Sequence, residues 1–277
     1  MDRRAFFFAV AGGAVLTLAG CTRMPQWDFP TASPSVGKRP TSTPQVTPGS
    51  ITSVPSSVPA PLQGPPQLTK VSLPKGVITA LPGHDALLAW TVDDGIDADV
   101  VLKYIEFASV TGTRLTFFLN GANSGWTKHA ALLRPLVASG QVQLGNHTWD
   151  HPNLTKLSDS HVVAELQRNH DFISTTYGVD ARPYYRPPYG FRNARVDRLA
   201  ASIGYSTPVL WYGTLSDSGL ITPEQVVSFA DQWFLPAHIV IGHANFPPVT
   251  TVFPQLSAMI HARGLQTVTL NDVFLKP

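Results

Sequence analysis

Apolar residues follow two patterns along the chain from about residue 69 onward, and together they predict a domain of strands and helices. Residues 86–92 form an almost continuous apolar run, which is typical of a strand buried on both faces of a sheet. Short strands that alternate with helices predict an α/β domain with a parallel sheet, open or closed into a barrel. The predicted strands are 87–92, 115–119, 142–144, 184–185, 208–211, 239–241 and 266–269. The predicted helices are 98–110, 130–138, 159–177, 194–203, 224–234 and 250–263.

The chain begins with a pattern typical of an export signal. Arg3 and Arg4 precede an apolar run over residues 5–19, which is shorter than the roughly 20 residues that a membrane-spanning helix needs. The run ends in Leu-Ala-Gly-Cys at residues 18–21, which resembles the lipobox of bacterial lipoproteins. The resemblance implies a signal peptide over 1–20, a lipid on Cys21 and an extracytoplasmic domain anchored to the membrane of a bacterial cell envelope. A plain secretory signal is the alternative, and the arginine pair leaves both Sec and Tat export open.

Residues 21–68 have the composition of a linker. After Cys21 they are rich in proline, serine and threonine, carry almost no charge and show no hydrophobic period. Because such a segment has too little apolar surface to offset the entropy cost of ordering, we expect it to be disordered. The globular composition that follows predicts one domain over 69–277, tethered to the membrane by this linker.

Charge and cysteine content narrow the classes of partner and ligand. The formal net charge is +2 and charged residues make up 14% of the chain, which argues against a nucleic-acid partner. Cys21 is the only cysteine, so the sequence has no internal disulfide and no cysteine-rich metal cluster. Metal binding therefore falls to histidine and carboxylate side chains.

Residues that could bind a metal follow two of the predicted strands. Asp93 and Asp94 end the run that starts at residue 86, and the carboxyl ends of parallel strands are where ligands and catalytic groups gather. His147 and His151 lie four apart, so both rings could reach one metal ion if the backbone makes a helical turn there. One aspartate with two histidines leaves a position open for water, as in a catalytic Zn²⁺ site.

Two further polar residues are ambiguous when each is taken alone. Arg186 precedes a Pro-Pro turn that would hold its guanidinium in one place, although a solvated arginine at a surface turn is the commoner outcome. His243 follows the apolar run 239–241, where a hydrogen-bonded core histidine is the commoner outcome.

Taken together, these clusters resemble the polysaccharide deacetylase family, also known as the NodB homology domain or carbohydrate esterase family 4. Residues 91–95, Thr-Val-Asp-Asp-Gly, resemble its T-F-D-D-G motif with valine in place of phenylalanine. Residues 147–152 match H-[ST]-x-x-H-P, and residues 186–190 match R-x-P-[YF]-G. Residues 241–243, Ile-Gly-His, resemble L-x-H with isoleucine in place of leucine. The resemblance runs from residue 86 to the C-terminus and implies a single distorted (β/α)7 barrel of the NodB type.

The resemblance implies a metal centre and the base that works beside it. Asp94, His147 and His151 would hold a divalent metal ion, usually Zn²⁺, with Co²⁺ or Mn²⁺ as alternatives. The metal would polarise the acetyl carbonyl and lower the pKa of its water. Asp93 would then be the general base that accepts the proton of this water.

The resemblance assigns three more residues to the same reaction. Arg186 would pair with Asp93 and keep it ionised and aimed. His243 would be the general acid that protonates the departing amine. The backbone N–H of Tyr189 would stabilise the tetrahedral oxyanion.

The family's remaining motif, D-x-x-D-W, is only partly present. In the comparable residues 211–218, Asp217 takes the second aspartate position, Thr214 replaces the first aspartate and Ser218 replaces the tryptophan. Asp217 would orient His243, or it is an ordinary loop aspartate. The missing tryptophan removes an aromatic wall of the usual substrate groove. Sugar-stacking faces could come from four other tryptophans, although core packing is the commoner fate of each: Trp126, Trp149, Trp211 and Trp233.

The sequence therefore predicts a metal-dependent hydrolase, expected to be monomeric, that removes N-acetyl groups from a cell-envelope glycan such as peptidoglycan. An O-acetyl esterase acting on a polysaccharide such as xylan is the alternative within hydrolases. A catalytically inactive carbohydrate-binding lipoprotein would be expected to lack a metal ligand or the base, and none of these is missing. A periplasmic solute-binding lipoprotein would need two similar lobes, which one domain with one set of motifs does not predict.

Overall fold

The computed structural model describes residues 66–83 and 85–276. The predicted signal peptide, Cys21 and nearly all of the predicted linker lie outside the described residues. Among the helices that are described, none is long and apolar enough to cross a membrane.

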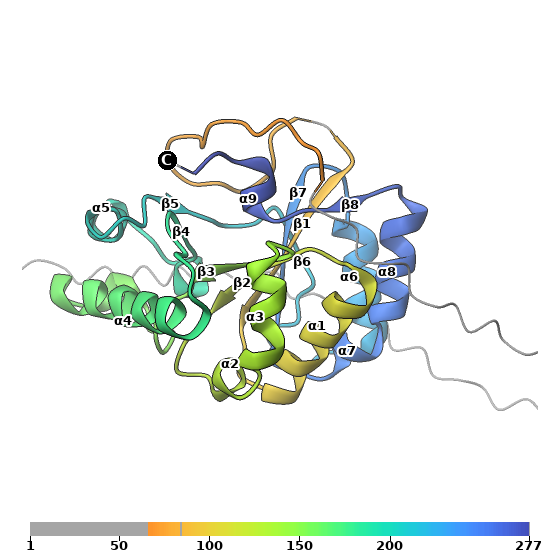
Figure 1. Ribbon diagram of the computed structural model, residues 1–277, viewed down its shortest axis with the longest axis horizontal. Coiled ribbons are helices and arrows are strands. Elements are labelled where there is room, and N and C mark those ends of the chain that lie inside the picture. The colour runs from red at the N-terminus through yellow and green to blue at the C-terminus, as the bar shows by residue number, and fades with distance from the viewer. Residues whose placement is uncertain (1–65, 84, 277) are drawn as a thin grey trace, which may run out of the picture. The chain divides into compact units, whose positions relative to one another are not determined.

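A parallel sheet forms the centre of the domain (Figure 1). Its strand order is β5-β4-β3-β2-β1-β7-β6, and β8 pairs with the start of β1. The strands are β1 (Leu87–Asp94), β2 (Leu115–Leu119), β3 (Val142–Asn146), β4 (Tyr184–Tyr185), β5 (Thr207–Pro208), β6 (Gly213–Thr214), β7 (His238–His243) and β8 (Gln266–Thr267). Because the strands run parallel, their carboxyl ends lie at one edge of the sheet.

Helices separate the strands and cover the outer face of the sheet. They are α1 (Ala98–Thr111), α2 (Ser124–Lys128), α3 (Ala130–Ala138), α4 (Asp159–Tyr177), α5 (Ala194–Ser202), α6 (Pro223–Trp233), α7 (Pro248–Thr251), α8 (Phe253–Ala262) and α9 (Leu270–Val273). Two short 3₁₀ helices, η1 (Leu154–Lys156) and η2 (Pro188–Gly190), lie in the loops after β3 and β4. Figure 1 shows α4 and α5 on the side of β3 and β4, and α6 and α8 on the side of β7 and β8.

The predicted alternation of strands and helices is confirmed, although β6, α2 and α9 were not predicted and the strand predicted over 266–269 ends at Thr267. Two further predicted elements are corrected by the structure. The strand predicted over 208–211 is wrong beyond Pro208, because the carbonyls of Val209 and Leu210 both turn toward one arginine side chain. Consecutive carbonyls of a strand point in opposite directions, so the strand ends here, and Val209 makes only an isolated parallel bridge with Ile78. The helix predicted over 250–263 is interrupted at Val252, since the ring of Pro254 cannot be accommodated inside a continuous helix.

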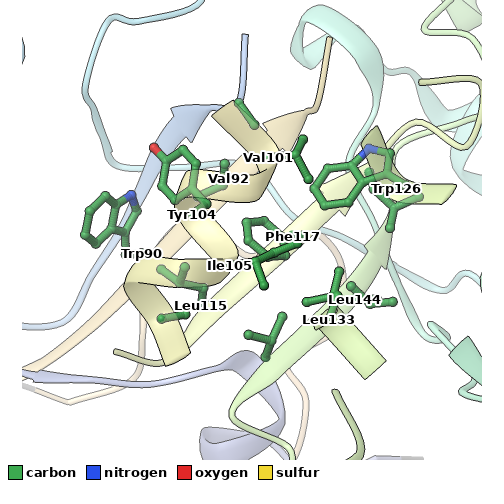
Figure 2. Packing of buried hydrophobic residues seen from close by; sticks show 14 of the residues in the cluster. Trp90, Val92, Val101, Tyr104, Ile105, Leu115, Phe117, Trp126, Leu133 and Leu144 are labelled. Carbon is green, nitrogen blue, oxygen red and sulfur yellow. The ribbon is translucent and has the colours of Figure 1, made fainter. Parts of the chain in front are cut away.

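Side chains of β1 alternate between two hydrophobic clusters. Leu88, Trp90 and Val92 face the helices, and Figure 2 shows Trp90 and Val92 beside Tyr104 of α1. Ala89 belongs to the second cluster, which fills the concave inner face of the sheet. Because strand side chains alternate, Thr91 and Asp93 continue this inner face toward the carboxyl end of β1. Asp93, a predicted site residue, therefore lies where the inner core meets the carboxyl end of β1.

Residues 66–83 cover part of the inner core beside β5, β7 and α9. The N–H of Val71 donates to the carbonyl of Val273, and the N–H of Ile78 donates to that of Pro208, both at 2.9 Å. The side chains of Ile78 and Leu81 are buried in the inner cluster. Figure 1 shows this orange segment beside α9. This segment therefore joins the end of β5 to the start of β7 across the inner core.

Gly145 of β3 provides a test of how tightly the inner face is packed. A Cβ at this position would lie 2.5 Å from two ring carbons of Phe118, so we expect Gly145→Ala to lower the free energy of unfolding by about 1–3 kcal/mol. Denaturant unfolding measures the change. Gly219→Ala is the matched control, since its Cβ meets nothing within 4 Å and the change should stay below about 1 kcal/mol. Equal stability of the two variants would contradict the packing argument.

Candidate active site

A cleft of about 570 Å³ opens at the carboxyl ends of β1, β3 and β7. It contains most of the residues that the sequence analysis selected. Arg186 and Asp217 do not line the cleft, because they are buried directly behind Asp93 and His243. The predicted residues that line it are Asp93, Asp94, His147, His151, Tyr189 and His243.

Three side chains in the cleft form a set that could hold a metal ion. The Oδ1 atom of Asp94 lies 3.2 Å from Nε2 of His147 and 3.4 Å from Nε2 of His151. This Oδ1 atom is buried without a hydrogen-bond donor, an arrangement that is costly unless a cation is bound. One carboxylate and two imidazoles fit a divalent ion such as Zn²⁺ and leave a position open.

The orientation and tautomer of His147 suit metal binding. Its Nδ1 lies 2.6 Å from the carbonyl oxygen of Arg186. A carbonyl can only accept a hydrogen bond, so Nδ1 carries the proton and donates it. In the neutral ring, Nε2 then presents its lone pair toward Asp94.

The two histidines converge through a loop, and the helical turn considered from their spacing is wrong. Thr148 and His151 have left-handed φ angles of 70° and 66°, which no helix contains. Thr148 Oγ1 accepts the N–H of His151 at 3.1 Å. The Oε2 atom of Glu165 on α4 accepts the N–H of Trp149 at 3.0 Å. Side-chain hydrogen bonds, rather than helical ones, therefore hold this loop.

Asp94 also has a left-handed backbone, with φ 69°. Three donors converge on its carbonyl: Trp126 Nε1 at 2.8 Å, Asn123 Nδ2 at 3.0 Å and the N–H of Asn120 at 3.3 Å. Gly95 lies against the Trp126 ring, where any Cβ would overlap the indole. Trp126 is fully buried, so the expectation that it could stack on a sugar is wrong. Its indole instead fixes the conformation at Asp94.

Asp93 is paired with a completely buried arginine. Arg186 Nη1 donates to Asp93 Oδ1 at 2.6 Å and to Thr91 Oγ1 at 2.9 Å. Its Nε and Nη2 atoms donate to the carbonyls of Val209 at 3.1 Å and Leu210 at 3.2 Å. The solvated surface arginine considered from sequence is therefore wrong. Since Oδ1 of Asp93 is engaged, Oδ2 is the oxygen left to face the cleft.

His243 and Asp217 form a second pair on the other side of the cleft. His243 Nδ1–H donates to Asp217 Oδ1 at 3.0 Å, and the backbone N–H of His243 donates to Oδ2 at 3.2 Å. Burial lowers the pKa of His243. The hydrogen bond and charge of Asp217, with the charges of Asp93 and Asp94, outweigh this effect and raise the pKa above its ordinary value.

The pKa values of Asp94 and His151 are both shifted in the direction that suits metal binding. Burial raises the pKa of Asp94, but the neighbouring rings of His147, His243 and His151 outweigh this effect, and the pKa lies well below its usual range. Burial lowers the pKa of His151, and the neighbouring His147 lowers it further. An ionised carboxylate beside a neutral imidazole is the form in which both residues bind a metal.

Comparisons with known proteins show which family has this site. A model of the polysaccharide deacetylase family matches residues 81–208. The peptidoglycan-N-acetylglucosamine deacetylase of Bacillus cereus is 31% identical over 201 residues, covering 70% of each protein. The chain belongs to the polysaccharide deacetylase family.

A second relative and a solved structure extend the comparison. Chitin deacetylase 1 of Cryptococcus neoformans var. grubii is 36% identical over 107 residues, which are 39% of this chain and only 22% of that protein. The crystal structure of a peptidoglycan N-acetylglucosamine deacetylase in complex with an N-oxidanyl-benzamide compound has a TM-score of 0.65 at 20% identity, covering 73% of this chain and 94% of that chain. This likeness confirms the predicted α/β fold of the NodB type.

This polysaccharide deacetylase departs from the family in the motif that holds Asp217. Thr214 replaces the first aspartate, and its Oγ1 accepts the N–H of Ser216 at 2.8 Å. Threonine and aspartate side chains both make this local turn, so Thr214 can support the left-handed Ser216, whose φ is 55°. The turn brings Asp217 to His243, and the reading of Asp217 as an ordinary loop residue is wrong. Ser218, in place of the family's tryptophan, lines the cleft.

Of the tryptophans considered for sugar stacking, Trp211 is the one that lines the cleft. Trp149 instead packs edge-on to Phe172 and lies 4.0 Å beneath the guanidinium of Arg168. Trp233 packs near Tyr212. Neither Trp149 nor Trp233 is among the residues that line the cleft.

Sequence reasoning missed the polar residues that support the deacetylase site from outside its motifs. Thr91 binds the buried arginine, and Asn120 Nδ2 donates to the carbonyl of Thr148 at 3.2 Å. Asn245 Nδ2 donates to Asp94 Oδ2 at 2.7 Å. Asn245 follows the apolar run 239–241 at the same sheet edge as the other site residues, and this position is the one signal that could have identified it.

Removing the buried arginine charge should be strongly destabilising. In Arg186→Met, Asp93 stays buried without its cation, and we expect the free energy of unfolding to fall by about 3–5 kcal/mol. The control is Lys103→Met, which breaks an exposed pair with Glu106 and should cost less than about 1 kcal/mol. Denaturant unfolding of both variants measures the difference. Similar losses in the two variants would contradict the argument that the buried Arg186 charge stabilises the domain more than an exposed ion pair does.

Proposed function

We propose that this chain is a metal-dependent hydrolase that removes N-acetyl groups from an N-acetylated cell-envelope glycan, with peptidoglycan as the first choice. One observation carries the proposal. The same cleft contains a metal-binding set around Asp94, a separate carboxylate on Asp93, and the ring of His243, which is paired with Asp217. These are the three chemical elements that amide hydrolysis needs.

The metal-binding residues would contribute electrophilic catalysis. A divalent ion, Zn²⁺ before Co²⁺ or Mn²⁺, held by Asp94, His147 and His151 would supply a Lewis acid for the acetyl carbonyl and lower the pKa of water. Tyr189 lies at the rim with a left-handed φ of 59°, and its ring centroid is 4.5 Å from that of His151. Its backbone N–H is the proposed donor to the oxyanion.

Asp93 and His243 would move the protons. The Oδ1 atom of Asp93 is engaged by Arg186, so Oδ2 accepts the proton of the attacking water. His243 donates Nδ1–H to Asp217, which directs the opposite nitrogen, Nε2, to protonate the departing amine. An amine leaves as the neutral molecule only after its nitrogen is protonated, so the intact pair of His243 and Asp217 favours N-deacetylation over O-deacetylation.

The choice of glycan rests on the cleft rim and on the relatives. Exposed apolar side chains at the rim, Ile96 and Tyr189, suit the faces of sugar rings. The names of the relatives, peptidoglycan-N-acetylglucosamine deacetylase and chitin deacetylase, support a polysaccharide substrate. The lipobox-like residues 18–21 support an extracytoplasmic, lipid-anchored enzyme that works on the cell wall.

Acetate release tests this proposal directly. The protein, stripped of metal and reloaded with Zn²⁺, Co²⁺ or Mn²⁺, should release acetate from peptidoglycan fragments or chitin oligomers. Asp93→Asn should bind the metal but lose about 10²- to 10⁴-fold in rate, because the base is removed. Asp231→Asn, at an exposed carboxylate of α6, is the control and should keep full activity.

Other outcomes of this assay separate the alternatives. Release from acetylated xylan alone would support the O-acetyl esterase. Metal binding without release from any of these substrates would contradict the proposed hydrolase and support the inactive carbohydrate-binding protein.

The pairing of His243 with Asp217 predicts a specific pH dependence. His243 must be protonated to act as the acid, and Asp217 raises its pKa, so activity extends to higher pH. In Asp217→Asn this pKa falls, although the charges of Asp93 and Asp94 remain. We therefore expect a lower kcat and an alkaline limb of the kcat profile that moves to lower pH. An alkaline limb that stays in place would exclude His243 as the acid governed by Asp217.

A further inference from the structure

Asn245 is a buried polar residue in the cleft that none of the motifs above includes. It lies two residues beyond His243, in the loop between β7 and α7, and only 5% of it is exposed. Both ends of its side-chain amide are used. Nδ2 donates to Asp94 Oδ2 at 2.7 Å, and Oδ1 accepts the N–H of Ile96 at 3.3 Å.

The contact with Ile96 determines which way the amide faces. A backbone N–H can only donate, so the oxygen of the amide must lie toward Ile96. The nitrogen is then directed at Asp94. An aspartate at position 245 could accept from Ile96 but would have no proton to donate to Asp94.

Backbone hydrogen bonds hold Asn245 in place relative to Asp94. The N–H of Ala244 donates to the carbonyl of Asp93 at 3.0 Å, and the N–H of Asp97 donates to the carbonyl of Ala244 at 3.3 Å. Both bonds are made by Ala244, the residue directly before Asn245, and they join the loop after β7 to the end of β1 and to the loop that follows it. The amide is therefore preorganised against one oxygen of Asp94.

The two carboxylate oxygens of Asp94 thus have different surroundings. Oδ2 is occupied by Asn245, whereas Oδ1 is buried without a donor and lies within 3.4 Å of both histidine Nε2 atoms. We propose that Asn245 is a positioning residue that restricts Asp94 to binding the metal through Oδ1 alone. This inference rests on the proposed metal site.

Restriction to one oxygen has a chemical consequence. A carboxylate that binds through both oxygens occupies two coordination positions, and the second would be taken from water or substrate. By holding Oδ2, Asn245 keeps a position open for the reaction. Residues outside the metal ligands are known to tune metal sites in this way.

The test compares Asn245→Leu with Asn123→Leu in the full-length protein. Leucine is similar in shape to asparagine but cannot hydrogen-bond. Asn123 also donates to Asp94, but to its backbone carbonyl, so it controls for general loosening of the loop. Two readouts need no catalysis: Zn²⁺ affinity by competition with a chelator, and the visible spectrum of the Co²⁺-loaded protein, whose intensity falls as coordination number rises.

We expect Asn245→Leu to bind Zn²⁺ about 10- to 100-fold more weakly and to give a weaker Co²⁺ spectrum than the wild type. Asn123→Leu should change the affinity and the spectrum clearly less than Asn245→Leu does, because its amide contacts the backbone of Asp94 and neither carboxylate oxygen. An Asn245→Leu protein with the affinity and spectrum of the wild type would overturn the inference, as would equal changes in the two variants. A wild type that binds no divalent ion would overturn the metal site and this inference with it.

Asn245→Asp keeps the inference testable if the leucine variant does not fold. It preserves the shape of the side chain and the contact with Ile96 but removes the donor to Asp94. Its Co²⁺ spectrum should also weaken, because Oδ2 is released to the metal. An unchanged spectrum in this variant would overturn the proposed restriction of Asp94.

Discussion

The buried guanidinium of Arg186 is the constraint on which the rest of the domain depends. A charge without solvent is tolerated only when it is paired and its donors are satisfied. Here the partners are Asp93 and Thr91 of β1 and the carbonyls of residues 209 and 210 after β5. These two segments and the loop after β4 that carries Arg186 must therefore be in place together. The carbonyl of the same arginine receives His147 Nδ1–H. The interaction that completes the inner core therefore also aligns the proposed base and a proposed metal ligand.

Backbone strain is concentrated around the same site. Among the described residues, five of the six non-glycine residues with positive φ lie at this site, at the end of β1 or in the segments that follow the strands. Each left-handed residue is costly unless the surrounding structure determines it. At Asp94 three donors on one carbonyl do so, and at Thr148 the buried Asn146 side chain accepts the N–H at 2.9 Å. The five residues are Asp94, Thr148, His151, Tyr189 and Ser216.

β1 and β7 join the two halves of the site. They are paired in register from Leu88 with His238 to Asp93 with His243, so the proposed base and acid leave the sheet side by side. Asn245 extends this junction beyond the strands by linking the loop after β7 to Asp94. A rigid junction of this kind suits catalysis that relies on preorganised groups rather than on movement.

The sequence by itself determined the alternation of strands and helices, the edge at which polar residues gather and the histidine-aspartate set, because these follow from local periodicity and short motifs. It left Asp217 undecided, suggested a wrong helical turn between His147 and His151, and offered no role for Asn245. Only the tertiary structure decided these points. Asp217 meets His243 across 26 residues and Asn245 meets Asp94 across 151. Such contacts arise from the packing of distant strands and loops, which no local pattern of residues encodes.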